Sequence, residues 1–480
     1  MAGATDTSWL ALAYVIAEWV IRLVMLFIVP WRRPPSTATA WLLLIYFWPV
    51  PGLLIYLLVG RSRLSRRHRD KLSELKRRLL PTLGHLATHP LIAMPTLPAE
   101  MGPVAQISRR VAPLPELGGN AVTLIGASDQ WLRQLIVDIE AASSSVHMAF
   151  YIARADDYTE PVFQALERAA ARGVEVRLLV DDVGSADFMR GLRRRVSDTG
   201  IQLVAAMPRS RLWRRSSRFD LRNHRKLVII DGRVGYTGSQ NLISPDFREG
   251  LVYEDLMVRL VGPVVLELQL VFVGDWFVEQ EEFLAGELYF PAPEAHGDVV
   301  AQGLPSGPEF PEAVQQRLML SLIHASTQSI FIATPYFVPD EPTLIALKSA
   351  AQRGVDVRLV VSERLDRRIV QWAQESYYEE LLEAGVRISR YPAGFLHAKT
   401  ALFDGYVVQI GSANFDVRSF LLNAEFSLLF YSPAVACAMA AGFEYYEQAA
   451  ERLELEQWVN ERAWYRQMME NVARLASPLL

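Results

Sequence analysis

The sequence predicts an α/β protein in which a two-span helical membrane hairpin precedes two pseudo-symmetric α/β domains. Three observations indicate this fold class: two long apolar stretches at the N-terminus, an α/β pattern that occurs twice, and a short motif found once in each copy. The 480 residues leave room for all three parts. We expect the hairpin over residues 1–60, a basic juxtamembrane linker over 61–115, and the two domains over 116–295 and 296–480.

The first element is a pair of apolar stretches, each long enough to cross a bilayer. Residues 9–29 contain only two charged side chains, and residues 38–59 contain none. About 20 apolar residues in a helix span the ~30 Å hydrocarbon layer. The connector 30–35 is short, so the two spans should form a helical hairpin. A cleaved signal peptide is disfavoured because a second apolar stretch follows the first.

Each stretch also has a feature that complicates a simple span. Glu18 and Arg22 stand four residues apart, where they can pair on one helix face. Because of these charges, a buried core helix is the alternative interpretation of this stretch. Pro49 and Pro51 should kink or break the second stretch. The second stretch could therefore be re-entrant rather than straight.

The distribution of charge predicts the orientation. Residues 61–78 contain nine basic residues and only two acidic ones, Asp70 and Glu74. The connector contains only Arg32 and Arg33. The positive-inside rule then places both termini and the two α/β domains in the cytoplasm. The basic run can lie on anionic lipid headgroups. A solvated helix face is the alternative.

Composition excludes several classes of function. Residues 1–80 have twelve Lys or Arg against four Asp or Glu, and the chain as a whole has a net charge of −4, so the remainder is acidic. An acidic soluble part argues against nucleic acid as a partner. The single cysteine, Cys437, excludes an internal disulfide and a cysteine-based metal site, and its Ala-rich surroundings predict a core thiol. The histidines outside the motifs show no metal-ligand spacing, so we expect no metal and activity without divalent ions.

The α/β pattern is an internal repeat. Residues 171–180 match 352–361 closely, and 142–151 match 325–336 more loosely. Each copy is predicted to run strand, helix, strand and then a motif hairpin, with apolar strands that indicate buried sheets. The helices are expected over 159–172 and 341–353, and each ends at a glycine, Gly173 or Gly354.

The repeated motif is His-x-Lys-x4-Asp followed by Gly-Ser-x-Asn. A strand places His and Lys on one face because side chains alternate. Such a pair alone is usually a surface strand, but two copies with the same downstream sequence are not expected by chance. The motif residues are His224, Lys226, Asp231, Ser239 and Asn241 in the first copy, and His397, Lys399, Asp404, Ser412 and Asn414 in the second.

These residue types suit phosphodiester chemistry without a metal. One imidazole can attack phosphorus, the other can protonate the leaving oxygen, and the lysines can hold the phosphoryl oxygens, with the Ser and Asn side chains as further substrate-binding groups. Two domains must face each other for both histidines to reach one phosphorus. Neither half would then be a complete active site.

Within each motif the aspartate and glycine predict a hairpin turn. If Asp231-Gly232 forms a two-residue loop, Ser239 faces His224, and Asp404-Gly405 likewise places Ser412 opposite His397. Asp231 lies five residues from Lys226, roughly 16 Å along a strand. We therefore interpret Asp231 and Asp404, although part of the motif, as structural residues of the turn.

Each motif is followed by an acid that could orient the imidazole. Asp255 lies 31 residues after His224, and Glu425 lies 28 residues after His397. A carboxylate bound to the second ring nitrogen fixes the tautomer and stabilises the imidazolium. Both acids interrupt apolar strands, which favours this role over a surface position.

A basic cluster before the first motif has no counterpart in the second half. It is interleaved with Trp213 and Phe219 and could contact membrane phosphates or the lipid headgroup. A solvated loop is the alternative. The residues expected to form this rim are Arg214, Arg215, Arg218 and Arg222.

The chain resembles the bacterial cardiolipin synthases of the phospholipase D superfamily, nearly from end to end. The resemblance rests on the segments 41–60 and 220–226, on Gly411-Ser412-Ala413-Asn414 with the residues that follow to Ser419, and on the C-terminal segment 470–480. It implies two phospholipase D-type α-β-α domains and an enzyme in the bacterial inner membrane. No cofactor is implied.

The reaction implied by the resemblance is transphosphatidylation. Two phosphatidylglycerol molecules would become cardiolipin and glycerol, with His224 forming a phosphohistidine and His397 acting as the acid and then the base. The lipid bilayer is the expected partner, and the sequence leaves open a homodimer. A phospholipase D that uses water as the acceptor is the alternative. A nuclease, a phosphatidylserine synthase and a non-enzymatic scaffold are less consistent with the sequence.

Overall fold

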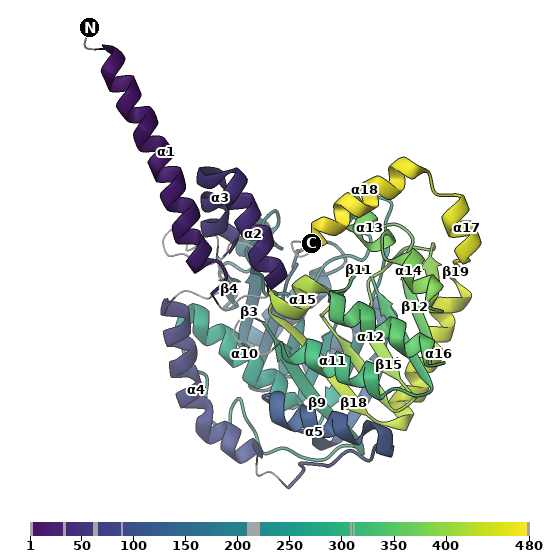
Figure 1. Cartoon of the computed structure of the whole chain (residues 1–480). Coiled ribbons are helices and arrows are strands. Elements are labelled where there is room, and N and C mark those ends of the chain that lie inside the picture. Colours follow the sequence, from purple (N-terminus) through teal and green to yellow (C-terminus); the bar gives the residue numbers. More distant parts are fainter. Residues whose placement is uncertain are drawn as a thin grey trace. The chain divides into compact units, whose positions relative to one another are not determined.

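The computed structural model describes residues 3–31, 35–60, 66–87, 90–208, 221–307, 310 and 313–477 (Figure 1). The chain divides into two compact units. Residues 1–69 and 209–221 form one unit, and residues 70–208 and 222–480 form the other. Both α/β halves belong to the second, larger unit, which we call the catalytic unit.

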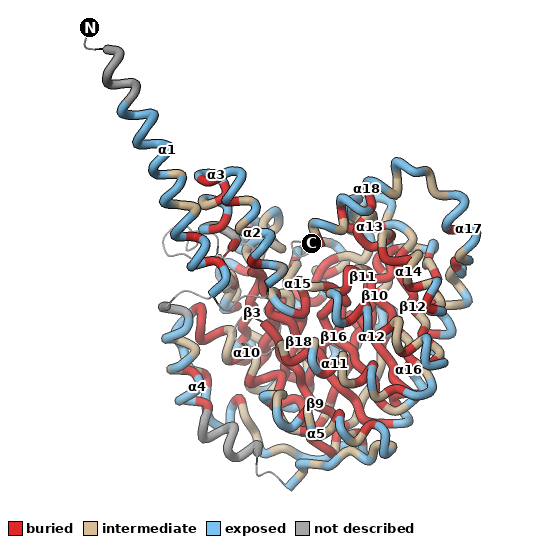
Figure 2. Tube along the Cα trace, in the orientation of Figure 1, coloured by how far each residue is buried: buried red, intermediate tan, exposed pale blue. Residues whose placement is uncertain are grey.

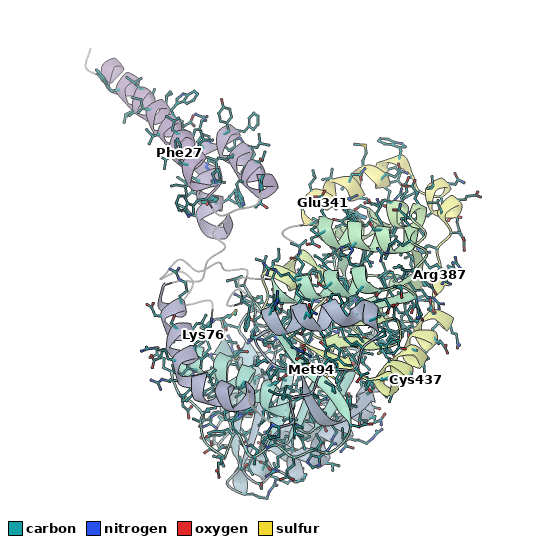
Figure 3. All side chains as sticks on the ribbon, turned by 60° about the horizontal axis from the view of Figure 1, so that its bottom comes forward. Phe27, Lys76, Met94, Glu341, Arg387 and Cys437 are labelled. Atoms are coloured by element: carbon teal, nitrogen blue, oxygen red, sulfur yellow. The ribbon has the colours of Figure 1, made fainter. Side chains whose placement is uncertain are left out.

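The N-terminal unit contains apolar helices. Its first helix, α1 (Gly3–Ile28), includes Trp9–Ile28, the one helix in the described residues that is long and apolar enough to cross a membrane. Most side chains of this segment are exposed, as Phe27 illustrates (Figure 3). The expected pair of Glu18 and Arg22 is confirmed, with Oε2 and Nη2 3.3 Å apart.

The second apolar stretch is broken where the prolines predict a break. Helix α2 (Pro35–Phe47) ends one residue before α3 (Pro49–Ile55), which continues as a π-helical turn (Tyr56–Gly60). Gly52 lies so close to α2 that an added Cβ would be 2.9 Å from Ile45 Cα, so the chain has turned back on itself. A 13-residue helix is only about 20 Å long. This stretch is therefore a short helical hairpin, not one straight helix.

The catalytic unit is built on a single sheet of 15 strands. The strand order is β19-β13-β12-β10-β15-β16-β18-β9-β1-β8-β6-β5-β2-β3-β4, so each half of the chain supplies one side of the sheet. The halves join where β1 and β9 pair antiparallel, with Leu117 opposite Ala301 and Asn120 opposite Val299. The two repeats thus form one continuous sheet.

The first half supplies the strands from β1 to β8. Helices α6, α7 and α8 pack on one face of these strands, and α10 packs on the other. The elements are β1 (Leu117–Ile125), α6 (Ser128–Glu140), β2 (Ser145–Phe150), α7 (Glu160–Ala171), β3 (Glu175–Asp181), α8 (Met189–Arg195), β4 (Gln202–Ala206), β5 (Leu227–Ile230), β6 (Val234–Gly238), β7 (Tyr253–Glu254), β8 (Met257–Val261) and α10 (Val265–Gln280).

The second half repeats this order and adds a helical C-terminus. Its elements are β9 (Val299–Ser306), α11 (Val314–Ala325), β10 (Ser329–Thr334), β11 (Phe337–Val338), α12 (Glu341–Gln352), β12 (Asp356–Ser362), α13 (Arg368–Glu375), α14 (Tyr378–Glu383), β13 (Arg387–Tyr391), β14 (Phe395–Leu396), β15 (Thr400–Phe403), β16 (Val407–Gly411), β17 (Phe415–Asp416), α15 (Val417–Leu421), β18 (Glu425–Tyr431), α16 (Pro433–Gln448), β19 (Glu451–Arg452), α17 (Leu455–Asn460) and α18 (Trp464–Leu475).

The repeated helices form where they are predicted. The helix expected over 159–172 is α7 and the helix expected over 341–353 is α12, and the glycines that end them have φ values of 90° and 91°. Before its motif, each half also contains a helical segment followed by a further strand, which is β4 in the first half and β13 in the second. The repeat pattern did not predict these elements.

The core explains why the halves depend on each other. Buried strands fill the centre of the catalytic unit (Figure 2). One buried cluster contains residues of both halves, including Ile229 of β5 and Ile410 of β16, together with α10 and α16. The prediction for Cys437 is wrong: this residue is exposed, because α16 buries the stripe that contains Val435 and Met439 instead.

Two helices of the linker also pack on the catalytic unit. Helix α4 (Arg66–Ala87) places Leu75 and Leu79 against α10, and Lys71 Nζ donates to the carbonyl oxygen of Val278 at 2.5 Å. A three-residue turn (Ala99–Met101) leads into α5 (Gly102–Val111), which packs beside α11 in the core of the second half. Of the basic run at positions 61–78, Arg69, Lys76, Arg77 and Arg78 are exposed on α4, whereas Lys71 packs against the end of α10.

Candidate active site

Both motif hairpins have three-residue loops rather than the predicted two. In the first, Leu227 pairs with Thr237 and Ile230 with Val234, which leaves residues 231–233 in the loop. In the second, Phe403 pairs with Val407. The predicted pairings of Ser239 with His224 and of Ser412 with His397 are therefore wrong by one residue. Asp and Gly both adopt the left-handed conformation in each loop, and a third residue completes the turn.

The motif aspartates hold the hairpin to the sheet. Asp231, with φ of 52°, accepts hydrogen bonds from the backbone N–H groups of residues 143, 144 and 145 at 2.8–2.9 Å. Asp404 does the same for residues 327, 328 and 329. Each carboxylate thus fixes the start of a neighbouring strand, β2 or β10. These contacts support the interpretation of Asp231 and Asp404 as structural residues.

The first histidine is held by the second half of the chain. The backbone N–H of His224 donates to the carbonyl oxygen of Ala424 at 2.8 Å. The next residue, Glu425, places Oε2 2.9 Å from His224 Nδ1. Backbone pairing and carboxylate therefore come from adjacent residues, Ala424 immediately before β18 and Glu425 at its start.

The second histidine is held in the same way by the first half. The backbone N–H of His397 donates to the carbonyl oxygen of Glu254 at 2.7 Å, and Asp255 Oδ1 lies 2.6 Å from His397 Nδ1. The predicted orienting acids thus meet the imidazoles, but in a crossed pattern. Each acid serves the histidine of the other repeat, which the order of residues along the chain does not reveal.

The motif serines lie behind these acids. Ser239 Oγ donates to Asp255 Oδ1 at 2.6 Å and accepts a hydrogen bond from the backbone N–H of Leu256. Ser412 Oγ donates to Glu425 Oε2 at 2.5 Å in the same manner. The hydroxyl proton of each serine is used to position a carboxylate, so these two residues orient the acids instead of facing a substrate as expected.

Electrostatics favour a neutral imidazole beside an ionised acid. Burial lowers the pKa of both His224 and His397 to about 4, against the opposing effect of their carboxylate partners. Burial opposes ionisation of Asp255 and Glu425 as well, but the imidazoles, lysines and serines around them outweigh it and hold each pKa below its usual value. At neutral pH each Nδ1–H therefore donates to a carboxylate, and each Nε2 keeps a lone pair.

Two buried lysines complete the set. Lys226 and Lys399 donate to the carbonyl oxygens of His224 and His397. Burial lowers the pKa of Lys226 to about 8 and that of Lys399 well below its ordinary value. Lys399 acts electrostatically on His224, and Lys226 on His397, so the two motif sets share one site.

The two motif asparagines differ in their hydrogen bonds. Asn241 Oδ1 accepts from the backbone N–H of Ile152 at 3.1 Å, which leaves its amide N–H₂ for another partner. Asn414 Oδ1 is buried and has no hydrogen-bond partner in the described residues. Within these residues no group of three His, Cys, Asp or Glu side chains could hold a metal ion.

Two tyrosines in the site were not predicted. The ring of Tyr151 lies 4.9 Å from that of His224 and also faces Lys226 Nζ, and the ring of Tyr253 lies 5.1 Å from that of His397. Both come from the first half. Tyr151 is the last residue of the repeated segment 142–151, and its place in that repeat is the sequence signal that could have indicated a role in the site.

The arginine rim is only partly described. Arg214, Arg215 and Arg218 lie outside the described residues. Arg222 is buried, with Nη1 3.4 Å from Asp181 Oδ1, and Asp181 also accepts from the backbone N–H of Asn223. Arg222 therefore does not form an exposed rim. It helps to fix the segment that carries His224.

Two crossed His–acid pairs and two buried lysines on this α/β fold define a phospholipase D-type phosphodiester transferase. A family model described as "Cardiolipin synthase, PLD-like domain" matches residues 135–276 and 319–446. Cardiolipin synthase A of Yersinia pseudotuberculosis is 34% identical over 99% of both chains, and that of Yersinia pestis matches equally well. The chain belongs to the cardiolipin synthase family.

A solved structure has the same fold. Phosphatidylserine synthase from Haemophilus influenzae Rd KW20 covers 78% of this chain and 99% of its own length, with a TM-score of 0.57 and 15% sequence identity. At this identity the likeness concerns the fold alone. It is consistent with the paired α/β halves described above.

Proposed function

We propose that this enzyme joins two phosphatidylglycerol molecules into cardiolipin and releases glycerol. Its membership of the cardiolipin synthase family supports this assignment. The observation that carries the mechanism is the crossed pairing of two neutral imidazoles with two ionised acids, beside Lys226 and Lys399. No nucleotide is needed, because one phosphodiester replaces another.

In the first step His224 acts as the nucleophile. Its Nε2 lone pair attacks the phosphorus of one phosphatidylglycerol, and the bond from phosphorus to the glycerol oxygen breaks. His397, which takes up a proton at Nε2 when the phosphodiester anion binds, gives that proton to the oxygen. The lysines and the amides of Asn241 and Asn414 stabilise the phosphoryl oxygens, and Glu425 stabilises the positive charge that develops on the imidazole.

In the second step His397 acts as the base. It takes the proton from the primary hydroxyl of a second phosphatidylglycerol, whose oxygen attacks phosphorus while the N–P bond to His224 breaks. His397 is again protonated, and the site returns to its starting state. The phosphohistidine is therefore the point at which a lipid alcohol and water compete as acceptors.

The membrane assignment is part of the same proposal. The helix Trp9–Ile28 crosses the bacterial inner membrane, the broken second stretch re-enters or spans it, and the catalytic unit lies on the cytoplasmic side. The substrate is thus a lipid of the bilayer to which the enzyme is attached. The composition of the catalytic unit does not suit nucleic acid.

Purified full-length enzyme with phosphatidylglycerol labelled in the glycerol headgroup tests the reaction. We expect one labelled glycerol released for each cardiolipin formed and little phosphatidic acid. A variant with His224→Ala is the matched control and should form neither product. Phosphatidic acid as the main product would instead identify a phospholipase D that uses water.

A further inference from the structure

The C-terminal helix α18 presents an apolar face to the outside. Six of its large apolar side chains are exposed, with values from 44% for Met469 to 82% for Leu475. At about 100° per residue they fall on one side of the helix. Figure 2 shows the exposed residues along α18. The residues of this face, which we call the α18 ridge, are Trp464, Tyr465, Met468, Met469, Val472 and Leu475.

The charged face of the same helix points inward. Arg466 pairs with Glu375 of α13 at 2.8 Å, and Arg474 pairs with Glu380 of α14 at 2.7 Å. Glu470 is buried and pairs with Arg462. A surface helix of a soluble protein normally has the opposite arrangement. The ion pairs therefore fix α18 with its ridge outward, so the ridge cannot be buried by a simple roll of the helix.

A basic segment precedes α13, the helix on which α18 packs. Arg364 and Arg367 are exposed and make no side-chain hydrogen bond or ion pair within the described residues, and Arg368 beside them stacks on Trp372. Ile369 follows and is also exposed. Apolar and cationic side chains side by side complement the acyl and phosphate layers of an anionic lipid surface.

This surface is connected to the active site through α13. Gln374 of α13 accepts a hydrogen bond from the backbone N–H of Phe337, and Phe337 pairs with Phe415, the residue after Asn414. Arg367 also acts electrostatically on Tyr151 and Tyr253, the tyrosines that contact the two histidines. Lipid held against α13 would thus lie close to the residues that surround the two histidines.

We propose that the α18 ridge and the arginines at 364, 367 and 368 form a second membrane-docking surface, separate from the N-terminal helices. The ridge inserts at the boundary between headgroups and acyl chains, about 5–10 Å deep, and the arginines bind lipid phosphates. This docking rests on the proposed function, because it presents bilayer phosphatidylglycerol to the two histidines. Its occupant is an anionic bilayer surface.

The first test measures the environment of the ridge in the full-length enzyme. The background is Cys437→Ser, and a single cysteine at Met468 or Val472 carries a nitroxide label. The control is the native Cys437, which is exposed on α16 (Figure 3). In phosphatidylcholine vesicles with phosphatidylglycerol, we expect the ridge labels to be more accessible to oxygen than to a water-soluble nickel complex, and Cys437 to show the reverse.

Two outcomes of this measurement would overturn the proposal. Ridge labels as accessible to the nickel complex as Cys437 would mean that the ridge stays in water. Spectra of the ridge labels that broaden in detergent without vesicles, because two labels lie close together, would mean that a second copy of the chain covers the ridge. Neither outcome depends on activity, so a failure of the proposed reaction would be distinguished from a failure of docking.

The second test compares vesicle and detergent-dispersed substrate. Met468→Asp with Val472→Asp should lower activity on vesicles at least tenfold and leave activity on dispersed lipid within about twofold, because only docking is lost. Ile345→Asp changes an exposed apolar residue of α12 in the same way and should have no effect on either substrate. Equal losses on vesicles and dispersed lipid would show that the ridge serves folding rather than docking.

Discussion

The imidazole of His224 is oriented by Glu425, a residue 201 positions later and in the other half of the chain, with Nδ1 and Oε2 2.9 Å apart. His397 and Asp255 form the reciprocal pair. Each half therefore supplies the imidazole of one pair and the carboxylate of the other. Separation of the halves would disable both histidines at once, which gives a physical reason for joining the repeats in one sheet.

The crossed pairing predicts a specific pattern of adduct formation. In a His397→Ala background, Glu425→Gln should lower the rate of phosphohistidine formation on His224 by roughly 10³–10⁴-fold, because the tautomer and the developing charge lose their carboxylate. Asp255→Asn in the same background should have little effect, since its partner is already absent. Single-turnover labelling with quenching measures both rates. A larger effect of Asp255→Asn would contradict the crossed arrangement.

The two-step mechanism predicts a trappable intermediate. His397→Ala should slow turnover by several orders of magnitude, because it removes the acid of the first step and the base of the second. The adduct that still forms on His224 should persist, since its transfer to the second lipid lacks that base. Mass spectrometry after rapid denaturation locates the adduct. The matched variant His224→Ala should show no adduct. An adduct on His397 in that variant would reverse the assigned roles.

The low pKa of the histidines predicts that substrate binding takes up a proton. Both have a pKa of about 4 in the free site, so at pH 7 neither is protonated, whereas the first step needs an acid. The bound phosphodiester anion raises the pKa of His397. Titration calorimetry with a non-reactive phosphodiester lipid, in two buffers of different ionisation enthalpy, should show uptake of about one proton at pH 7. His397→Ala should abolish the uptake, and none in the native enzyme would mean that His397 is already charged.

The structural role of Asp231 predicts a stability effect with little change in chemistry. Asp231→Ala leaves three backbone N–H groups without their acceptor and should destabilise the fold by roughly 1–3 kcal/mol. The thermal unfolding midpoint in detergent should fall, while activity per folded molecule at low temperature stays within a few-fold. Asp404→Ala is the matched change in the second repeat. A loss of activity without a loss of stability would give Asp231 a catalytic role.

The N-terminal helices should anchor the enzyme and take no part in the chemistry. A chain that begins at Arg66 keeps α4, whose Leu75 and Leu79 pack on α10, and should fold. We expect it to act on detergent-dispersed phosphatidylglycerol and poorly on vesicles, with residual vesicle binding through the α18 ridge. The same truncation with Met468→Asp should lose that binding too. Full activity on vesicles without α1–α3 would remove their anchoring role.

Much of the fold could be predicted because its signals are local. The helices at 159–172 and 341–353 follow from periodicity and a terminal glycine, and the break near Pro49 follows from the missing backbone N–H of proline. The hairpin register could not be derived in this way. A loop of two residues and a loop of three both fit Asp-Gly, and backbone dihedral angles with strand pairing decide between them.

The sequence by itself determined the catalytic residue types, their duplication and the family of the enzyme, because a repeated His-x-Lys motif with Gly-Ser-x-Asn has few alternatives. It also identified Asp255 and Glu425 as candidate orienting acids, although neither interrupts a strand: Asp255 lies between β7 and β8, and Glu425 begins β18. Only the tertiary structure decided which acid serves which histidine, that Ser239 and Ser412 position those acids, that Arg222 is buried, and that α18 turns its apolar face outward. Each of these depends on contacts between residues far apart in the chain, and such contacts leave no periodic or local pattern in the sequence.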